Sequence, residues 1–197
     1  MDKTLVLFDF DGTITSKDTF LELIKFHKGT SRFYAGMLLL LPRLLLFKAG
    51  FISSQSMKET VVGFFWKGTD VTEFDKVCDD FCSQVLPGLI RPAALKTLQK
   101  HIEEGHMVAV VSASAENWVK PFCSEFNIKC IATRLEKKEN KLTGKLQGLN
   151  CNAEEKVTRI KQVFDLNNYE GITAYGDSNG DKPMFRLASV AHFKPFR

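Results

Sequence analysis

The sequence predicts an α/β protein in which a parallel β-sheet carries helices on both faces. Short apolar stretches alternate along most of the chain with longer stretches of helical periodicity, an order that is typical of β-α-β units. The expected strands lie at about 5–8, 107–111, 129–133, 172–175 and 190–193. The second of these is apolar throughout, as strands that are buried on both faces of a parallel sheet are.

Helical periodicity predicts the remaining elements, several of which begin at a capping residue. Ser16 or Asp18 can cap the first helix, and Thr69 or Asp70 can cap a later one. The expected helices cover about 20–26, 54–65, 71–86, 93–104, 115–126 and 153–165, and a short one follows Pro183. Charged residues together with a glycine predict a β-hairpin within 134–147 that lies outside the core.

These elements divide into two units. Residues 1–15 and 87–197 form the expected α/β catalytic core, which is Rossmann-like, and residues 16–86 form an inserted all-helical cap. Leu86-Pro87-Gly88 is a turn sequence that marks the end of the insertion. A chain of 197 residues is long enough for one domain with such an insertion.

The composition is that of an ordinary globular protein. An apolar fraction of 44% and a charged fraction of 25% argue against disorder. The net charge of +4 suits an anionic substrate and is too small to indicate a nucleic-acid partner. Five cysteines without a Cys-x-x-Cys pair predict reduced thiols in a cytoplasmic protein. Met1–Lys3 lead directly into the first strand, so no signal peptide is expected.

The stretch from 33 to 47 is unusually rich in leucine, and Pro42 and Arg43 interrupt it. The run is shorter than the roughly 20 apolar residues that span a bilayer, and a longer span would bury Arg43. The favoured prediction is a helix packed inside the cap. The alternative is a helix pair on a membrane surface, with peripheral contact through 33–52. Eight Lys and Arg residues against three Asp and Glu between 17 and 67 give a local excess of 8 − 3 = +5, which supports this alternative.

Two aspartates follow the first apolar run, in the sequence Asp9-Phe10-Asp11-Gly12. If the chain stays extended, Asp9 and Asp11 point the same way and crowd two carboxylates together. Like charges this close are unfavourable unless a cation lies between them or one carboxylate is protonated. Oxygen ligands without nearby histidines or paired cysteines favour Mg²⁺ over Zn²⁺. The alternative is that these residues form only a polar turn after a strand.

A second acidic cluster favours the metal site over the turn. Gly176-Asp177-Ser178-Asn179-Gly180-Asp181 also follows an apolar strand sequence, 172–175. Because parallel strands end at the same edge of a sheet, both clusters are expected at the edge where open α/β sheets bind ligands.

Four motifs now fall at strand ends or helix starts: Asp9-x-Asp11-x-Thr13, Ser112, Lys156, and Asp177 with Asp181. In this order they resemble the haloacid dehalogenase superfamily of phosphotransferases, and within it the phosphoserine-phosphatase-like subfamily IB hydrolases. The resemblance covers the α/β part, about 1–15 and 87–197. It implies a Mg²⁺-dependent phosphoric monoester hydrolase.

The resemblance also assigns roles at the reacting phosphate. Asp9 would be the nucleophile that forms an aspartyl phosphate. Asp11 would protonate the leaving alcohol and then activate water. Thr13 would hold the loop. Lys156 would neutralise charge on the nucleophile and on the phosphoryl group.

Other motif residues would bind the phosphate and the metal. Ser112 and the backbone amides of Ala113 and Ser114 would donate to phosphoryl oxygens at a helix amino terminus. Asp177 would complete the Mg²⁺ shell with Asp9 and the backbone carbonyl of Asp11. Asp181 and Asn179 would support this shell.

Departures from the family pattern bear on the substrate. Gly180 replaces the asparagine that usually precedes the last aspartate, and Asp18 stands where serine-specific enzymes carry a glutamate. The favoured substrate is a small soluble phosphorylated metabolite, phosphoserine-like among others. One alternative is a lipid phosphate, because phosphatidylglycerophosphate phosphatases are similar in their apolar cap segment and in their Asp-Ser-x-x-Asp motif. An alternative of another class is a catalytically weak membrane-peripheral binding module. No oligomeric state is predicted.

Overall fold

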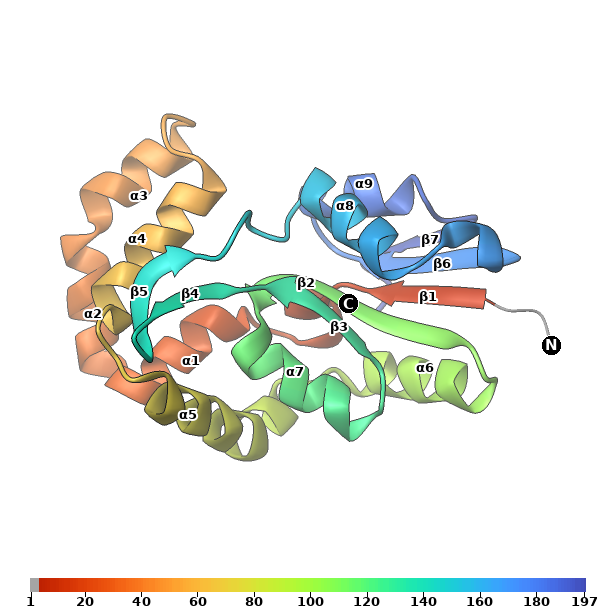
Figure 1. Cartoon of the computed structure of the whole chain (residues 1–197), viewed down its shortest axis with the longest axis horizontal. Helices are drawn as coiled ribbons and strands as arrows, with labels where there is room; N and C mark the ends of the chain where they lie inside the picture. The colour runs from red at the N-terminus through yellow and green to blue at the C-terminus, as the bar shows by residue number, and fades with distance from the viewer. Residues whose placement is uncertain (1–3) are drawn as a thin grey trace.

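A computed structural model describes residues 4–197, so the expectation for Met1–Lys3 lies outside the described residues. Five parallel strands form the central sheet in the order β3-β2-β1-β6-β7 (Figure 1). The strands are β1 (Thr4–Phe8), β2 (Met107–Ala115), β3 (Lys129–Thr133), β6 (Gly171–Gly176) and β7 (Val190–Phe193). The predicted parallel α/β fold is confirmed.

Alternate residues of β1 pack into two separate cores, one on each face of the sheet. Val6 and Phe8 join the larger cluster, whereas Leu5 and Leu7 join the smaller one. Helices α6 (Pro92–Glu103) and α7 (Glu116–Glu125) cover the first face, and α8 (Glu154–Val163) and α9 (Lys182–Phe185) cover the second (Figure 1). Because both faces are covered, the central strand β1 is apolar from Leu5 to Phe8.

Five α-helices are inserted between β1 and α6. They are α1 (Thr19–Lys28), α2 (Thr30–Leu39), α3 (Leu41–Lys48), α4 (Ser54–Trp66) and α5 (Val71–Gln84). Asp18 and Asp70 cap α1 and α5 as predicted, and Ser53 caps α4. The chain leaves and re-enters the core side by side, at a bridge between Thr15 and Ile90.

The hairpin of β4 (Leu135–Lys138) and β5 (Lys141–Leu146) packs against α4, so the prediction that it lies outside the core is wrong. Its three leucines, Leu135, Leu142 and Leu146, are buried in the larger cluster. Backbone hydrogen bonds also join the hairpin to the turn after α4, where the Gly68 N–H donates to the Leu142 carbonyl over 2.8 Å. The apolar partners of these leucines lie on α4, for example Val62, which is 142 − 62 = 80 positions before Leu142, so the local pattern does not reveal them.

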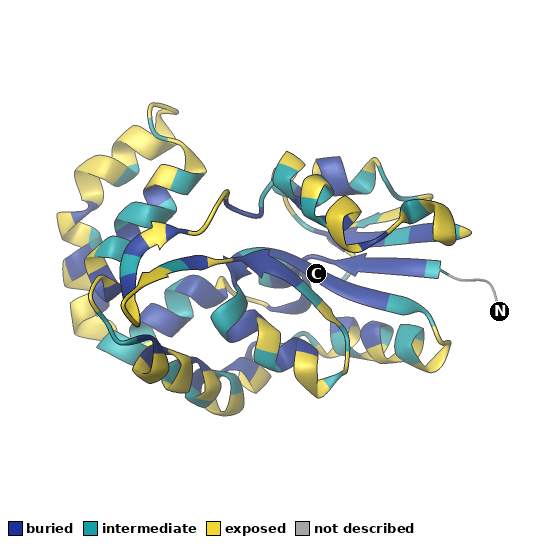
Figure 2. Cartoon of the chain, in the orientation of Figure 1, coloured by how far each residue is buried: buried dark blue, intermediate teal, exposed yellow. Residues whose placement is uncertain are grey.

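The leucine-rich segment forms two short helices instead of one packed helix. α2 buries Phe33 and Gly36, but α3 buries none of its residues, so the prediction of a helix packed inside the cap is wrong for α3 (Figure 2). A helix that is apolar on every side can bury only the side that meets a neighbour. Within residues 4–197, no single helix passes the length and hydropathy test for a membrane span; α2 and α3 pass it only as a pair bent by 63°.

All five cysteines are free, as predicted, and none forms a disulfide. Three of them, Cys78, Cys123 and Cys151, are buried, and burial raises the pKa of the Cys151 thiol to about 11. These thiols therefore contribute to packing as small apolar side chains.

Two glycines test the contact between the hairpin and α4. Gly144 and Gly148 both have a positive φ, near 88° and 84°. Their surroundings differ: a Cβ on Gly144 would lie 2.7 Å from the Gly63 Cα, whereas a Cβ on Gly148 would meet nothing within 4 Å. Both Gly→Ala variants should lose about 1–2 kcal/mol to the left-handed backbone. Gly144→Ala should lose a further 1–3 kcal/mol or so from overpacking. Urea unfolding measures both losses, and equal losses would contradict the contact.

Candidate active site

The turn after β1 brings the two predicted acidic clusters together. Asp9 continues the strand with φ −69° and ψ 160°, and its N–H donates to the Tyr175 carbonyl of β6 over 2.8 Å. The turn Phe10–Ile14 follows, in which Gly12 has φ +81°. A Cβ on Gly12 would lie 2.5 Å from an oxygen of Asp177. Glycine is therefore required twice, for its backbone conformation and for the approach of this carboxylate.

Three carboxylates form a cluster that could hold a cation. Oxygens of Asp9, Asp177 and Asp181 all lie within 4.8 Å of one another. Burial raises the pKa of Asp9 to about 7, although Lys156 opposes the shift, and burial also raises the pKa of Asp177. The pKa of the third carboxylate, Asp181, is lowered. An all-oxygen donor set in which two carboxylates have raised pKa values fits a hard divalent cation such as Mg²⁺, which would favour their ionised forms.

Lys156 lies at the centre of this cluster. Its Nζ donates to Asp9 over 2.6 Å and to Asp181 over 2.7 Å, and all three side chains are buried. Burial disfavours the charged ammonium, but the two carboxylates outweigh burial and raise the pKa of Lys156. The two carboxylates therefore favour the charged form of Lys156, which contacts the predicted nucleophile.

Asp181 is tied to the turn that carries Asp177. Its second oxygen accepts from the N–H groups of Asp177 and Ser178 and from the Ser178 hydroxyl, over 2.8–3.1 Å. This arrangement holds both acidic residues of the late motif in fixed positions. Asn179, which was predicted to support the site, is exposed and lies outside the lining of the pocket.

The Asp11 carboxylate does not join the cluster, in contrast to the expectation from strand alternation. One oxygen accepts from the N–H and hydroxyl of Thr19, both over 2.6 Å, and the other accepts from the Ser114 hydroxyl over 2.5 Å. The extended chain ends at Asp9, so alternation no longer sets the direction of Asp11. Asp11 still lines the same pocket as Asp9.

The residues around Ser112 lie at the junction of a strand and a helix. β2 continues with an irregular register from Ser112 to Ala115, and α7 begins at Glu116 with Ala115 as its N-cap, so Ser112, Ala113 and Ser114 directly precede the amino terminus of α7. The Ser114 N–H donates to the Ser112 hydroxyl over 2.9 Å and is already engaged. Ser112, Ala113 and Ser114 nevertheless line the pocket together.

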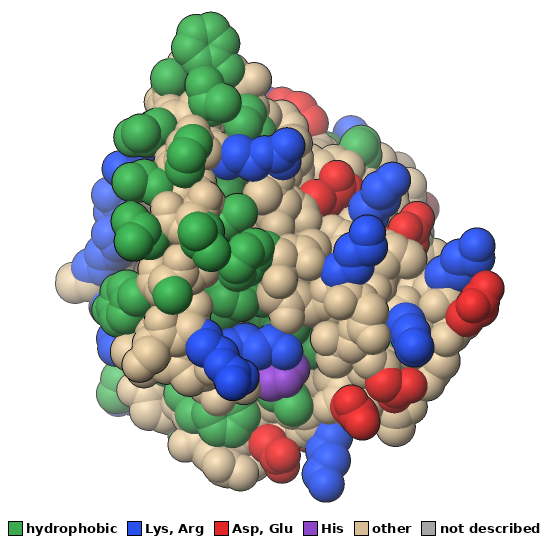
Figure 3. Space-filling model, turned by 90° about the vertical axis from the view of Figure 1, so that its left-hand side faces the viewer, with side chains coloured by type: hydrophobic (Ala, Val, Ile, Leu, Met, Phe, Trp, Pro, Cys, Tyr) green, Lys and Arg blue, Asp and Glu red, His purple; other side chains and the backbone are tan. Residues whose placement is uncertain are grey.

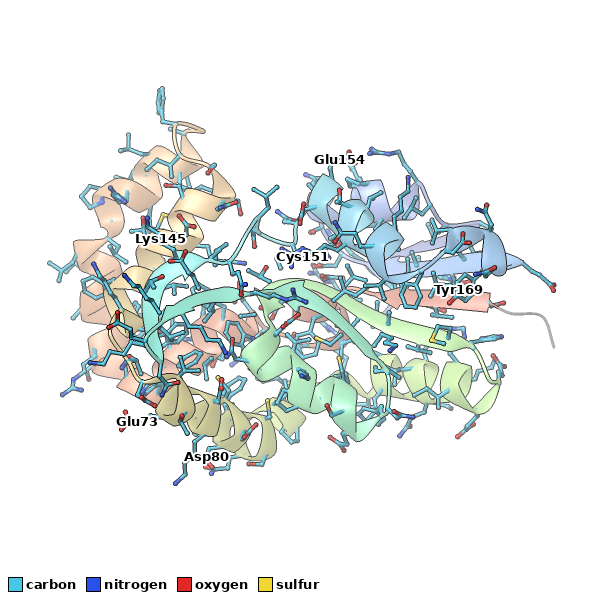
Figure 4. The ribbon with its side chains drawn as sticks, in the orientation of Figure 1. Glu73, Asp80, Lys145, Cys151, Glu154 and Tyr169 are labelled. Atoms are coloured by element: carbon cyan, nitrogen blue, oxygen red, sulfur yellow. The ribbon has the colours of Figure 1, made fainter. Side chains whose placement is uncertain are left out.

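Lys58 is a site residue that the sequence analysis missed. It reaches into the pocket from α4, and its Nζ donates to the Ala113 carbonyl over 2.7 Å and to the Asn150 Oδ1 over 2.9 Å. Asn150 lies on the connection from β5 to α8, next to Cys151, which Figure 4 labels. The sequence did contain an indication of this position. Lys58 precedes the buried Val62 by one helical turn and the buried Phe65 by two, so it lies on the buried face of α4.

The pocket that these residues enclose has a volume of about 160 Å³. Its lining includes the acidic residues Asp9, Asp11, Asp18 and Asp177 and the two lysines Lys58 and Lys156. Burial lowers the pKa of Lys58 to about 8. Burial and the charge of Asp11 raise the pKa of Asp18 to about 6, and the same carboxylate caps α1. The pocket thus offers two cations and one separate carboxylate to a bound molecule.

A parallel α/β core with polar groups gathered at the carboxyl ends of β1, β2 and β6 is the arrangement of an α/β enzyme. Residues 6–186 match the model of the haloacid dehalogenase-like hydrolases, and the chain belongs to this family. The predicted family and the prediction that the protein is a hydrolytic enzyme are confirmed.

Several known proteins are similar over nearly the whole chain. Protein CicA of Caulobacter vibrioides is 33% identical over 195 residues, which cover 98% of this chain and 86% of CicA. A probable phosphatase of Mycobacterium tuberculosis is 27% identical over 196 residues, which cover 96% of this chain and 67% of that protein. A solved structure of phosphoserine phosphatase as a phospho-aspartyl intermediate analogue has a TM-score of 0.64 at 23% identity and covers 97% of this chain and 86% of its own. At this identity the structural likeness shows a shared fold.

The contacts of Lys156 predict a large loss of stability when its charge is removed. In metal-free protein, Lys156→Met should lower the free energy of unfolding by about 3–5 kcal/mol, because Asp9 and Asp181 lose their buried counter-charge. The loss should shrink in acid, where the two carboxyl groups are protonated. Lys161→Met, on the exposed side of the same helix, is the matched control. Equal unfolding midpoints of the two variants in urea would refute the central role of Lys156.

Proposed function

We propose that this protein is a Mg²⁺-dependent phosphatase that hydrolyses phosphomonoesters through an aspartyl phosphate on Asp9. The observation that supports this most is the buried Asp9 carboxylate, which lies beside Asp177 and is bound to Lys156. The names of the relatives agree with it, since one is a probable phosphatase and another is a phosphoserine phosphatase with a phospho-aspartyl analogue.

In the first step a carboxylate oxygen of Asp9 attacks phosphorus, and the bond from phosphorus to the ester oxygen breaks. The leaving alcohol takes a proton from Asp11, whose carboxylate is oriented by Thr19 and Ser114. Lys156 and Thr13, which both contact Asp9, hold the nucleophile in place. Mg²⁺ bound by Asp9, Asp177 and the Asp11 carbonyl would neutralise charge on the phosphoryl oxygens.

In the second step water attacks phosphorus, Asp11 accepts a proton from this water, and the bond between Asp9 and phosphorus breaks. The products are inorganic phosphate and the regenerated carboxylate. The small volume of the pocket limits the bulk water around the phosphoryl group during the first step. Asp181 acts on both steps indirectly, because it fixes Lys156 and the turn of Asp177.

The substrate is proposed to be a small phosphorylated metabolite. Lys58 and Lys156 supply positive charge for a dianionic phosphoryl group, and Ser112 and Ala113 line the same pocket. Asp18 would face a cationic group such as the ammonium of a phosphorylated amino acid. We propose that residues 16–86 act as a cap over the α/β core formed by 1–15 and 87–197, because α4 brings Lys58 into the site.

A lipid phosphate is the second candidate substrate. The observation that favours it is the exposed apolar surface of α2 and α3 on the same cap. A lipid headgroup offers the same phosphomonoester chemistry to the pocket. Hydrolysis of short-chain lipid phosphates compared with phosphoserine distinguishes the two candidates.

Removal of the nucleophile tests the proposed chemistry. Asp9→Asn should lower the hydrolysis of an aryl phosphate at least about a thousandfold, because the amide cannot form the covalent intermediate. Chelation of divalent metal by EDTA should have a similar effect on the wild type, and added Mg²⁺ should reverse it. Glu170→Gln, at an exposed carboxylate, should retain full activity. Full activity of Asp9→Asn would exclude the proposed intermediate.

The lowered pKa of Lys58 predicts a dependence on pH. Below a pH of about 8 the ammonium is charged and attracts the phosphoryl dianion, and above it this charge is lost, so kcat/KM should fall as the pH rises beyond 8. Lys58→Arg keeps its charge and should remove this decline, whereas Lys58→Gln should lower kcat/KM at every pH. A decline that persists unchanged in Lys58→Arg would show that another group titrates.

A further inference from the structure

The outer side of the cap carries an apolar surface that the proposed chemistry does not use. We call it the cap patch and define it by six residues of α2, α3 and the loop after them: Tyr34, Leu38, Leu39, Leu45, Leu46 and Phe51. Their exposed fractions lie between 46% and 80%. Figure 3 shows apolar side chains gathered along this face of the molecule.

The cap patch is unlike the exposed face of a neighbouring helix. α5 leaves polar and charged residues such as Glu73, Asp75 and Lys76 in solvent. α2 instead leaves leucines in solvent although its opposite side, with Phe33 and Gly36, is already buried. An apolar surface of this extent marks an interaction site.

The charge of the same segment indicates the kind of partner. From Leu23 to Lys58 the sequence contains no Asp or Glu and six Lys or Arg residues. Arg32, Arg43 and Lys48 are exposed on or beside the two helices. Lys and Arg side chains border the apolar surface in Figure 3. Apolar side chains with a basic border match the acyl chains and the anionic headgroups of a membrane surface.

The packing of α2 favours a position on the membrane surface over insertion across it. A Cβ on Gly36 would lie 2.6 Å from the Phe65 ring of α4, so α2 packs closely against α4. The Arg43 guanidinium donates to the Thr60 hydroxyl of the same helix over 2.7 Å. With one side held against α4, the bent pair has only its other side free for lipid.

We propose that the cap patch docks this protein on the surface of bilayers that contain anionic lipids. Docking requires no chemistry at Asp9, so it goes beyond the proposed phosphatase activity and is measured without substrate. Both the apolar side chains and the basic border contribute: the first insert between the lipids and the second contact the headgroups. The pocket side of the cap, with Lys58, does not take part.

Vesicle sedimentation tests the proposal with the full chain. The wild type should sediment with vesicles of phosphatidylcholine mixed with phosphatidylglycerol, and much less with phosphatidylcholine alone. A variant with serine at Leu38, Leu39, Leu45 and Leu46 should bind at least about tenfold more weakly, because it lacks the apolar side chains that would be buried in the lipid. Leu149→Ser with Val163→Ser, at exposed apolar positions outside the cap patch, is the matched control and should bind like the wild type.

Hydrolysis of an aryl phosphate by the serine variant should equal that of the wild type, which shows that the fold is intact and separates this test from that of the proposed function. Arg32→Gln with Lys48→Gln should lose the preference for phosphatidylglycerol. The proposal is overturned if the wild type stays in the supernatant with both kinds of vesicle, or if the control loses binding as the serine variant does. Self-association that the serine variant abolishes, without any vesicle binding, would also overturn it in favour of a second copy of this chain.

Discussion

The ammonium of Lys156 lies between the carboxylates of Asp9 and Asp181, and the arrangement of the whole site depends on this buried group of charges. Three carboxylates lie within 4.8 Å of one another, and such crowding is unfavourable unless cations lie beside them or one carboxylate is protonated. Lys156 supplies one positive charge from α8, the Arg197 guanidinium pairs with Asp177, and a divalent ion would add further positive charge. The same electrostatic demand suits catalysis, because a phosphate dianion entering the pocket meets cations that are already in position.

The sheet is what brings these charges together. β1 and β6 are neighbours in parallel register, with Phe8 opposite Tyr175, so the residues that follow them emerge at the same edge. Gly12 then lets the first turn approach Asp177 closely. Helix α8, packed on the sheet through Ile160, directs Lys156 toward this edge. Asp9 and Asp177 are thus held directly after two neighbouring strands of the core, and Lys156 is held by a helix packed on the same sheet.

The cap has two surfaces of different chemistry. Its inner surface brings Lys58 and Asp18 to the pocket, where the pKa of Lys58 is lowered and that of Asp18 is raised. Its outer surface, on α2 and α3, is apolar and basic. The hairpin of β4 and β5 packs on α4 at Gly144, where a Cβ would lie 2.7 Å from the Gly63 Cα. One helix, α4, therefore links the inner surface to the outer one.

The sequence by itself determined the parallel α/β class, the positions of the strands, and the placement of Asp9 and Asp177 at one edge, because strand periodicity and turn residues are local properties. It also indicated the motif lysine, Lys156. Only the tertiary structure decided that Asp11 turns to Thr19 and Ser114, that the Ser114 amide is engaged, that Lys58 enters the pocket, and which leucines remain exposed. These features depend on which distant surface each side chain meets, and a periodic pattern shows which face of an element is apolar but not what covers it.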